Sequence, residues 1–230
     1  MNLFKAMTVT GALVVISVSA HAASYSFSCI STGAAAACAD GVSKLTMDVN
    51  AGTGGSVNFT FKNFSALGSS ITEIYFDDGT LLGISSLASS GTGVVFSNIG
   101  SANPGNLPGG NSVAPAFNVT AGFLVDTGNG GPTKGVENKL DGGAQEFVTI
   151  NFSLINGKSF NDTIAALNGP LGDGNDLRVG LHVKSFGVSV GGTSASFISA
   201  VPEPTSVAML LSGLGLLGSV VRRKSTTVSS

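Results

Sequence analysis

VTINFSL at residues 148–154 alternates apolar and polar side chains with a period of two, and this stretch decides the fold class. Such alternation predicts a β-strand that buries one face and exposes the other. The pattern recurs at residues 57–62 (VNFTFK) and 177–184 (LRVGLHVK). Three such runs in one chain predict a protein built mainly from β-strands.

Turn-forming sequences rich in Gly, Pro and Asn separate these runs, for example at residues 103–110 and 127–132. Glycine supplies positive φ angles and proline fixes φ, so both residues end strands. Residues 162–167 (DTIAAL) are the only predicted helix, with Asn161 or Asp162 as its N-cap. We expect one all-β domain, an antiparallel β-sandwich of jelly-roll-like topology. Weaker strand candidates lie at residues 25–29, 44–49, 72–77, 93–97, 116–125 and 187–190.

The first 22 residues have the features of a signal peptide. Lys5 lies in a charged n-region, residues 11–18 (GALVVISV) form an apolar stretch, and Ala20-His21-Ala22 gives a small-x-small cleavage pattern. The apolar stretch is shorter than the roughly 20 residues that a membrane-spanning helix needs. We therefore expect signal peptidase to cleave after Ala22 and leave a glycine-rich domain at residues 23–200.

The C-terminal segment has three parts. Pro202-Glu203-Pro204 precedes an almost wholly apolar run at residues 206–221 (SVAMLLSGLGLLGSVV), which Arg222, Arg223 and Lys224 follow. A helix of this length spans about 24 Å, slightly less than the hydrocarbon layer, and the basic side chains can snorkel to close the gap. The basic cluster is expected to stop transfer and stay cytoplasmic with residues 225–230, leaving the domain outside.

This three-part segment, residues 201–224, resembles the PEP-CTERM sorting signal of Gram-negative bacteria that make exopolysaccharide and grow as biofilms. The resemblance implies that an exosortase recognises Pro202, Glu203 and Pro204 and cuts nearby. The precursor would be anchored transiently in the inner membrane with a periplasmic domain, and the product would then move to the cell surface or extracellular matrix. The domain itself is similar to PEP-CTERM proteins without an assigned activity, at residues 25–29, 69–84, 103–110 and 177–186.

Charge and cysteine content restrict the kind of partner. Residues 23–200 contain seven Lys or Arg and twelve Asp or Glu, a formal charge of −5. Nucleic-acid binding, which needs clustered cations, is therefore disfavoured. Cys29 and Cys38 are the only cysteines, and an exported domain is expected to pair them in a disulfide.

Two strings imitate catalytic or nucleotide-binding motifs. Residues 187–191 match G-x-S-x-G around Ser189, but no helix is predicted after them and no histidine follows. Residues 213–218 match G-x-G-x-x-G, yet they lie inside the apolar run, where small residues favour helix packing. His182 is the only histidine left after signal cleavage and is expected to be solvated. We therefore predict that the protein is not an enzyme, with a secreted hydrolase as the second alternative.

The remaining candidates are a metal site and a glycan site. Asp77, Asp78, Asp173 and Asp176 lie in strand ends or turns, where carboxylates often bind calcium in secreted β-domains, although turns favour Asp for conformational reasons too. No other cofactor is expected. We predict a structural or interaction role in the cell envelope or matrix, associated with exopolysaccharide. The first alternative is a calcium-dependent glycan-binding module, although the chain has no Trp and only two Tyr for a stacking platform.

Overall fold

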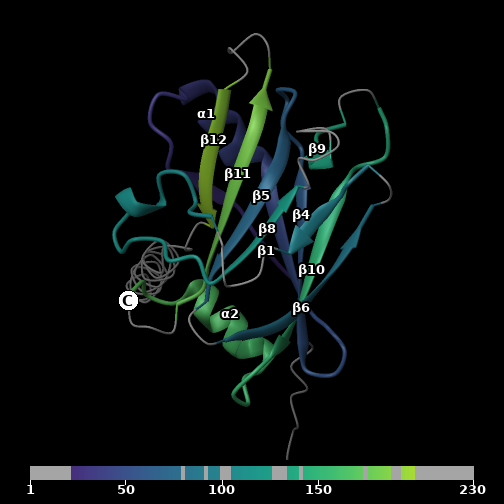
Figure 1. Cartoon of the computed structure of the whole chain (residues 1–230), viewed down its shortest axis with the longest axis vertical. Coiled ribbons are helices and arrows are strands. Elements are labelled where there is room, and N and C mark those ends of the chain that lie inside the picture. The colour runs from purple at the N-terminus through teal and green to yellow at the C-terminus, as the bar shows by residue number, and fades with distance from the viewer. Residues whose placement is uncertain are drawn as a thin grey trace, which may run out of the picture.

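The protein is a sandwich of two antiparallel β-sheets (Figure 1). The structure, a computed structural model, describes residues 22–78, 81–90, 93–98, 105–125, 134–139, 142–172, 176–187 and 193–199. The predicted signal peptide, Ser189 and the tail from residue 201 onward, including the predicted membrane helix at 206–221, lie outside these ranges. Among the described residues, no helix combines the length and the hydropathy that a membrane crossing requires.

One sheet has five strands in the order β1-β3-β4-β10-β6. The other has seven strands, in the order β2-β12-β11-β5-β8-β7, with β9 paired to β5. The structure therefore confirms an all-β sandwich, while its jelly-roll-like type stays a prediction. The five-stranded sheet contains β1 (Ala23–Tyr25), β3 (Leu45–Ala51), β4 (Ser56–Asn63), β6 (Leu82–Ser89) and β10 (Phe147–Leu154). The seven-stranded sheet contains β2 (Phe27–Cys29), β5 (Ser70–Asp77), β7 (Phe96–Asn98), β8 (Ala121–Val125), β9 (Val136–Glu137), β11 (Arg178–Phe186) and β12 (Thr193–Ser199).

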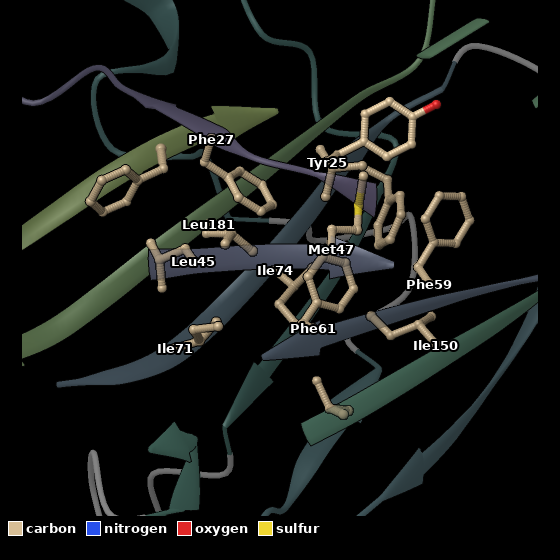
Figure 2. Close-up of a cluster of buried hydrophobic side chains, with 14 of the residues drawn as sticks. Tyr25, Phe27, Leu45, Met47, Phe59, Phe61, Ile71, Ile74, Ile150 and Leu181 are labelled. Atoms are coloured by element: carbon tan, nitrogen blue, oxygen red, sulfur yellow. The ribbon is translucent and has the colours of Figure 1, made fainter. Parts of the chain in front are cut away.

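The core lies between the two sheets and is rich in phenylalanine. Figure 2 shows Phe61 of the five-stranded sheet beside Ile74 of the seven-stranded sheet, and Phe59 and Leu181 belong to the same buried cluster. Phe76 makes edge-to-face contacts with Phe59 and Phe152, whose ring centroids lie 5.1 and 4.8 Å from its own. Such pairs stabilise a fold by about 0.5–1.5 kcal/mol beyond the burial of their area. The apolar side of each alternating strand thus forms the core, as the sequence pattern predicts.

One strand prediction near the N-terminus was wrong in detail. Residues 25–29 do not form one strand, because the chain crosses between the sheets at Ser26. Tyr25 pairs with Met47 in one sheet, while Phe27 pairs with Ser199 in the other. Tyr25 and Phe27 both belong to the core, each from a different sheet.

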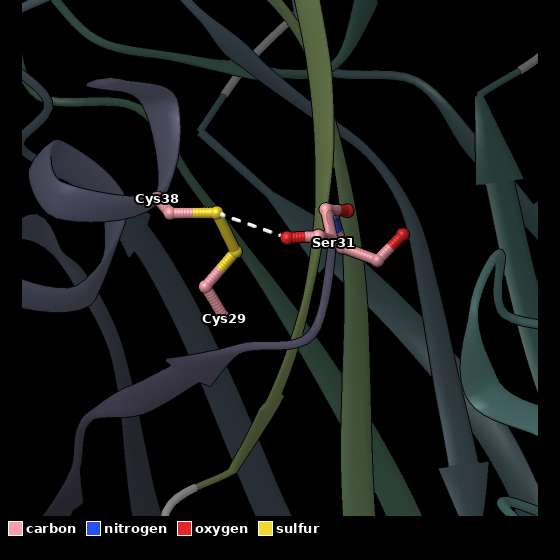
Figure 3. The surroundings of a disulfide bond; sticks show 4 residues. Cys29, Ser31 and Cys38 are labelled. Atoms are coloured by element: carbon pink, nitrogen blue, oxygen red, sulfur yellow. Dashed lines mark hydrogen bonds between the residues drawn. A yellow bond between two sulfur atoms is a disulfide. The ribbon is translucent and has the colours of Figure 1, made fainter. Parts of the chain in front are cut away.

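The segment after Cys29 contains a helix, although residues 162–167 were the only predicted one. Residues Ala35–Lys44 form helix α1, because a run of alanines strongly favours helix. The predicted disulfide between Cys29 and Cys38 is present and joins β2 to α1, with 5.3 Å between the two Cα atoms. Figure 3 shows this bond beside Ser31, whose carbonyl oxygen lies 3.7 Å from Cys38 Sγ. The bond therefore fixes α1 against the edge of the seven-stranded sheet.

The predicted helix near residue 162 is α2 (Phe160–Asn168), but its N-cap is Ser159 rather than Asn161 or Asp162. Asp162 instead completes a capping box with Ser159, and its carboxylate accepts the Ser159 N–H at 2.7 Å. A short 3-10 turn, η1, occupies Gly110–Ser112. Strands β6, β9 and β12 were missed because their sequences lack a clean alternation of apolar and polar residues.

Candidate functional site

The outer face of the five-stranded sheet is lined by short polar side chains. Strands β3, β4 and β10 each place alternate residues in the core, so the residues between them point outward. The strand register aligns them in rows: Asn50, Asn58 and Asn151 lie in one row, and Asp48, Thr60 and Thr149 lie in the next. We call this surface the polar face; its members are Asp48, Asn50, Ser56, Asn58, Thr60, Lys62, Thr149, Asn151 and Ser153.

Hydrogen bonds between neighbouring strands hold these side chains in place. The hydroxyl groups of Thr60 and Thr149 lie 2.8 Å apart, and the Asn151 amide donates to Asn58 Oδ1 at 2.6 Å. The Asn151 amide also donates to Ser56 Oγ at 3.1 Å. All these residues are partly exposed. The face therefore offers ordered amide and hydroxyl groups, which both donate and accept hydrogen bonds.

The two charged residues of the polar face neutralise each other. Lys62 Nζ donates to Asp48 Oδ2 at 2.8 Å, and Ser24 Oγ donates to Asp48 Oδ1 at 2.8 Å. Partial burial alone would raise the pKa of Asp48, but these hydrogen bonds and the charge of Lys62 outweigh it and lower the pKa. The face consequently carries no net charge at neutral pH.

The outer face of the seven-stranded sheet is different, because residues 105–119 cover much of it. Leu107 and Phe117 pack with Tyr75 and Ile198 in a second apolar cluster outside the main core. Gly180 makes room for this cover, since a Cβ atom there would lie 2.7 Å from Leu107 Cδ2. This face is therefore used for packing.

Arg178 fixes the cover to the end of the sheet. Its side chain is 4% exposed, and it donates to the carbonyl oxygens of Pro115 at 2.7 Å and Ala116 at 2.6 Å. The guanidinium also lies 5.3 Å from the centre of the Phe117 ring and pairs with Asp77. Arg178 was not among the predicted functional residues, because its place on the polar side of a predicted strand gave no sign of burial.

Two of the four predicted calcium ligands lie beside this arginine. Asp77 pairs with Arg178, and Asp176 Oδ2 lies 3.8 Å from Arg178 Nε. Asp78 instead accepts hydrogen bonds from Thr120 and, at 2.8 Å, from the Leu82 N–H; its burial raises the pKa. Asp173 lies outside the described residues. The part of the chain that the structure describes contains no group of three His, Cys, Asp or Glu that could hold a metal ion.

The sequence predicted a solvated His182, but the structure places this side chain beside Glu73. Its Nδ1 lies 2.9 Å from Glu73 Oε2, and Lys184 Nζ donates to Glu73 Oε1 at 2.7 Å. Tyr75 donates to the same carboxylate at 2.9 Å. Burial opposes ionisation of Glu73, but the hydrogen bonds from His182 and Lys184 prevail and lower its pKa to about 2. Burial and the Glu73 charge raise the pKa of Tyr75.

Strand register also places a serine beside this histidine. Ser196 of β12 is the cross-strand partner of His182, so Glu73, His182 and Ser196 form a row across three strands. A hydrolase needs its serine within hydrogen-bonding reach of the base and accessible to substrate. Ser196 is only 1% exposed, and its hydroxyl has no hydrogen-bond partner among the described residues. The row therefore lacks the geometry of a nucleophile activated by its base.

The sorting segment begins shortly after the last strand of the sandwich. Strand β12 ends at Ser199, whose hydroxyl accepts a hydrogen bond from the Val179 N–H at 3.1 Å. Pro202, Glu203, Pro204 and the basic cluster Arg222, Arg223 and Lys224 lie outside the described residues, as do residues 213–218. Only two residues separate Ser199 from Pro202 in the sequence.

Comparison with known proteins identifies the same segment. Residues 200–224 match the family model of the PEP-CTERM protein-sorting motif. No curated protein and no solved structure matches the chain. The chain thus carries a PEP-CTERM sorting motif, which supports export and processing of a membrane-anchored precursor by an exosortase.

Proposed function

We propose that exosortase processing delivers this domain to the cell surface or extracellular matrix, where it acts as a non-catalytic interaction protein. The observation that supports a binding role is the polar face, whose side chains all remain partly exposed. An open sheet face of ordered amides and hydroxyls suits a neutral, hydroxyl-rich polymer, because each group can donate to or accept from a sugar hydroxyl. We propose a neutral exopolysaccharide as the partner.

The seven-stranded sheet is less suited to this role. Its outer face carries the 105–119 cover and the charged group around Glu73. Tyr75, one of only two tyrosines, is 2% exposed and belongs to the covered cluster, so it offers no stacking platform. The sugar contacts are therefore expected to be polar and to come from the five-stranded sheet.

Binding of the released protein to purified exopolysaccharide, measured by calorimetry or co-sedimentation, tests this proposal. Replacing Asn58 and Asn151 together by Ala removes two ordered amides from the centre of the polar face and should weaken binding at least tenfold. Ser43→Ala, an exposed hydroxyl on α1, is the matched control and should bind like the wild type. Equal binding by both variants would contradict the proposal.

Calcium dependence is tested in the same assay. Asp77 and Asp176 already share the guanidinium of Arg178, so we expect binding to persist in a chelator. Loss of binding on chelation, with recovery on adding calcium, would instead support the calcium-dependent module. Hydrolysis of the polysaccharide that is lost in Ser189→Ala or Ser196→Ala would show an enzyme and overturn the non-catalytic assignment.

A further inference from the structure

Strand β6 forms an edge of the five-stranded sheet. It is eight residues long and, within the described ranges, pairs only with β10. The opposite edge, β1, has three residues. A strand edge presents unpaired N–H and C=O groups that can pair with another strand, and the longer edge offers more of them.

The segment of β6 at residues 85–89 carries none of the usual protections against such pairing. Natural edge strands are commonly protected by Lys, Pro or a bulge, or are very short. The sequence Leu82–Ser89 (LGISSLAS) contains no charged residue and no proline. Its pairing with β10 is regular from residue 85 to residue 89, since the irregularity lies between Phe152 and Leu154.

Leu87 is the apolar residue that the open edge leaves uncovered. It pairs with Ile150, which is fully buried, so Leu87 lies on the core side of the sheet. It is nevertheless 36% exposed, because the sheet ends beside it. A further strand along β6 would remove this apolar surface from water.

The backbone of Leu87 points toward the open edge. The Ser90 N–H donates to the Phe147 carbonyl on β10 at 3.1 Å. In an antiparallel pair, successive residues direct their backbone groups alternately toward and away from the partner strand. Counting back from Ser90, Ala88 points toward β10 and Leu87 points away from it.

We infer that β6 pairs antiparallel with β6 of a second copy of this chain, about a two-fold axis at Leu87. The axis places Leu87 opposite Leu87 of the second copy and exchanges two backbone hydrogen bonds between them. It also places Ser86 opposite Ala88 of the second copy, so that small side chains meet on the outer side. One neutral segment thereby supplies both halves of a self-complementary contact.

The pairing joins two sheets into one and goes beyond the proposed glycan binding. Because the two-fold axis runs perpendicular to the sheet, the polar faces of both copies lie on the same side. Two linked binding faces hold a repeating polymer more tightly than either face alone. Dimer formation does not itself depend on a glycan ligand.

Chemical crosslinking of Leu87→Cys tests the inferred contact in the full chain. Cys29 and Cys38 are joined in a disulfide, so the introduced cysteine supplies the single free thiol. Intact exosortase-positive cells treated with a short bismaleimide should yield a covalent homodimer. Phe64→Cys, 47% exposed in the segment after β4, controls for random collision and should give at least fivefold less dimer. Equal yields, or crosslinking of Leu87→Cys only to other proteins, would overturn the inference.

Light scattering of the released protein provides a second, independent readout. The wild type should have the mass of a dimer, and Leu87→Lys should have the mass of a monomer because like charges would face each other across the axis. Circular dichroism checks that the Leu87→Lys variant keeps its strands. If this variant does not fold, the crosslinking of Leu87→Cys alone tests the dimer. A monomeric wild type at all accessible concentrations would overturn the inference.

Discussion

The outer faces of the two sheets differ although both come from alternating strands. On the five-stranded sheet, every outward position of β4 is a Ser, Asn, Thr or Lys, and all four side chains stay partly exposed. On the seven-stranded sheet, Tyr75, Gly180 and Ile198 allow Leu107 and Phe117 to form a second apolar layer. One face therefore contributes to stability, and the other stays partly exposed and is the face that we propose binds the polymer. Changes to the two faces should affect different properties of the protein.

The largest effect on stability is expected from Arg178→Ala. This change removes the hydrogen bonds to Pro115 and Ala116 and leaves the half-buried Asp77 without its guanidinium partner. Removing one partner of a buried ion pair lowers the free energy of unfolding by about 3 kcal/mol. Denaturant titration of the released protein measures this loss.

The matched control for Arg178→Ala is Lys62→Ala, which breaks an ion pair on the polar face. Both side chains of that pair are about one-third exposed, so the loss should stay below about 1 kcal/mol. Equal losses in the two variants would contradict the assignment of packing to one face and binding to the other.

An intermediate effect, dependent on pH, is expected from Glu73→Gln. The pKa of Glu73 is about 2 in the folded protein and 4.5 as its ordinary value, so folding favours the charged form. The stabilisation is present above pH 4.5 and is lost as the pH falls toward 2. The variant should lower the free energy of unfolding by about 1.5 kcal/mol at neutral pH, because hydrogen bonds to a charged group are lost.

The same variant should show a shallower decline in stability between pH 4.5 and pH 2 than the wild type. Unfolding titrations at several pH values give both slopes. Identical slopes would mean that Glu73 does not contribute to the acid sensitivity of the seven-stranded sheet.

The smallest effect on stability is expected from Asn151→Ala. Water can replace its partners on the open polar face, so the free energy of unfolding should change by no more than about 0.5 kcal/mol. Binding of exopolysaccharide should nevertheless weaken. A loss of stability as large as that of Arg178→Ala, with unchanged binding, would show that the polar face is structural.

Sequence periodicity predicted most of the strands that form the core, although not β12, and it did not predict how their outer faces are used. Alternation in β4, β10 and β11 identified which residues point inward. It could not show that residues 105–119 fold over one sheet, because that segment has no periodic pattern. His182 and Arg178 therefore looked like exposed strand residues, whereas the structure pairs them with Glu73 and Asp77.

The sorting motif can be identified from the sequence alone, whereas the polar face can be identified only from the structure. Its three parts are contiguous, so sequence alone identifies residues 200–224. The polar face requires three strands brought together from residues 48–62 and 149–153. Only the strand register shows that Asn58 lies beside Asn151 and Thr60 beside Thr149.

The most direct test of the account is to map the bound polysaccharide by NMR on the protein released from exosortase-positive cells. Amide and side-chain signals are followed while fragments of the exopolysaccharide are added. We expect the largest shifts on the polar face, with Asn58, Thr60, Thr149 and Asn151 at the centre. The signals of Tyr75, Phe117 and His182 should change little. Shifts centred on the seven-stranded sheet, or no shifts at saturating polysaccharide, would contradict this expectation.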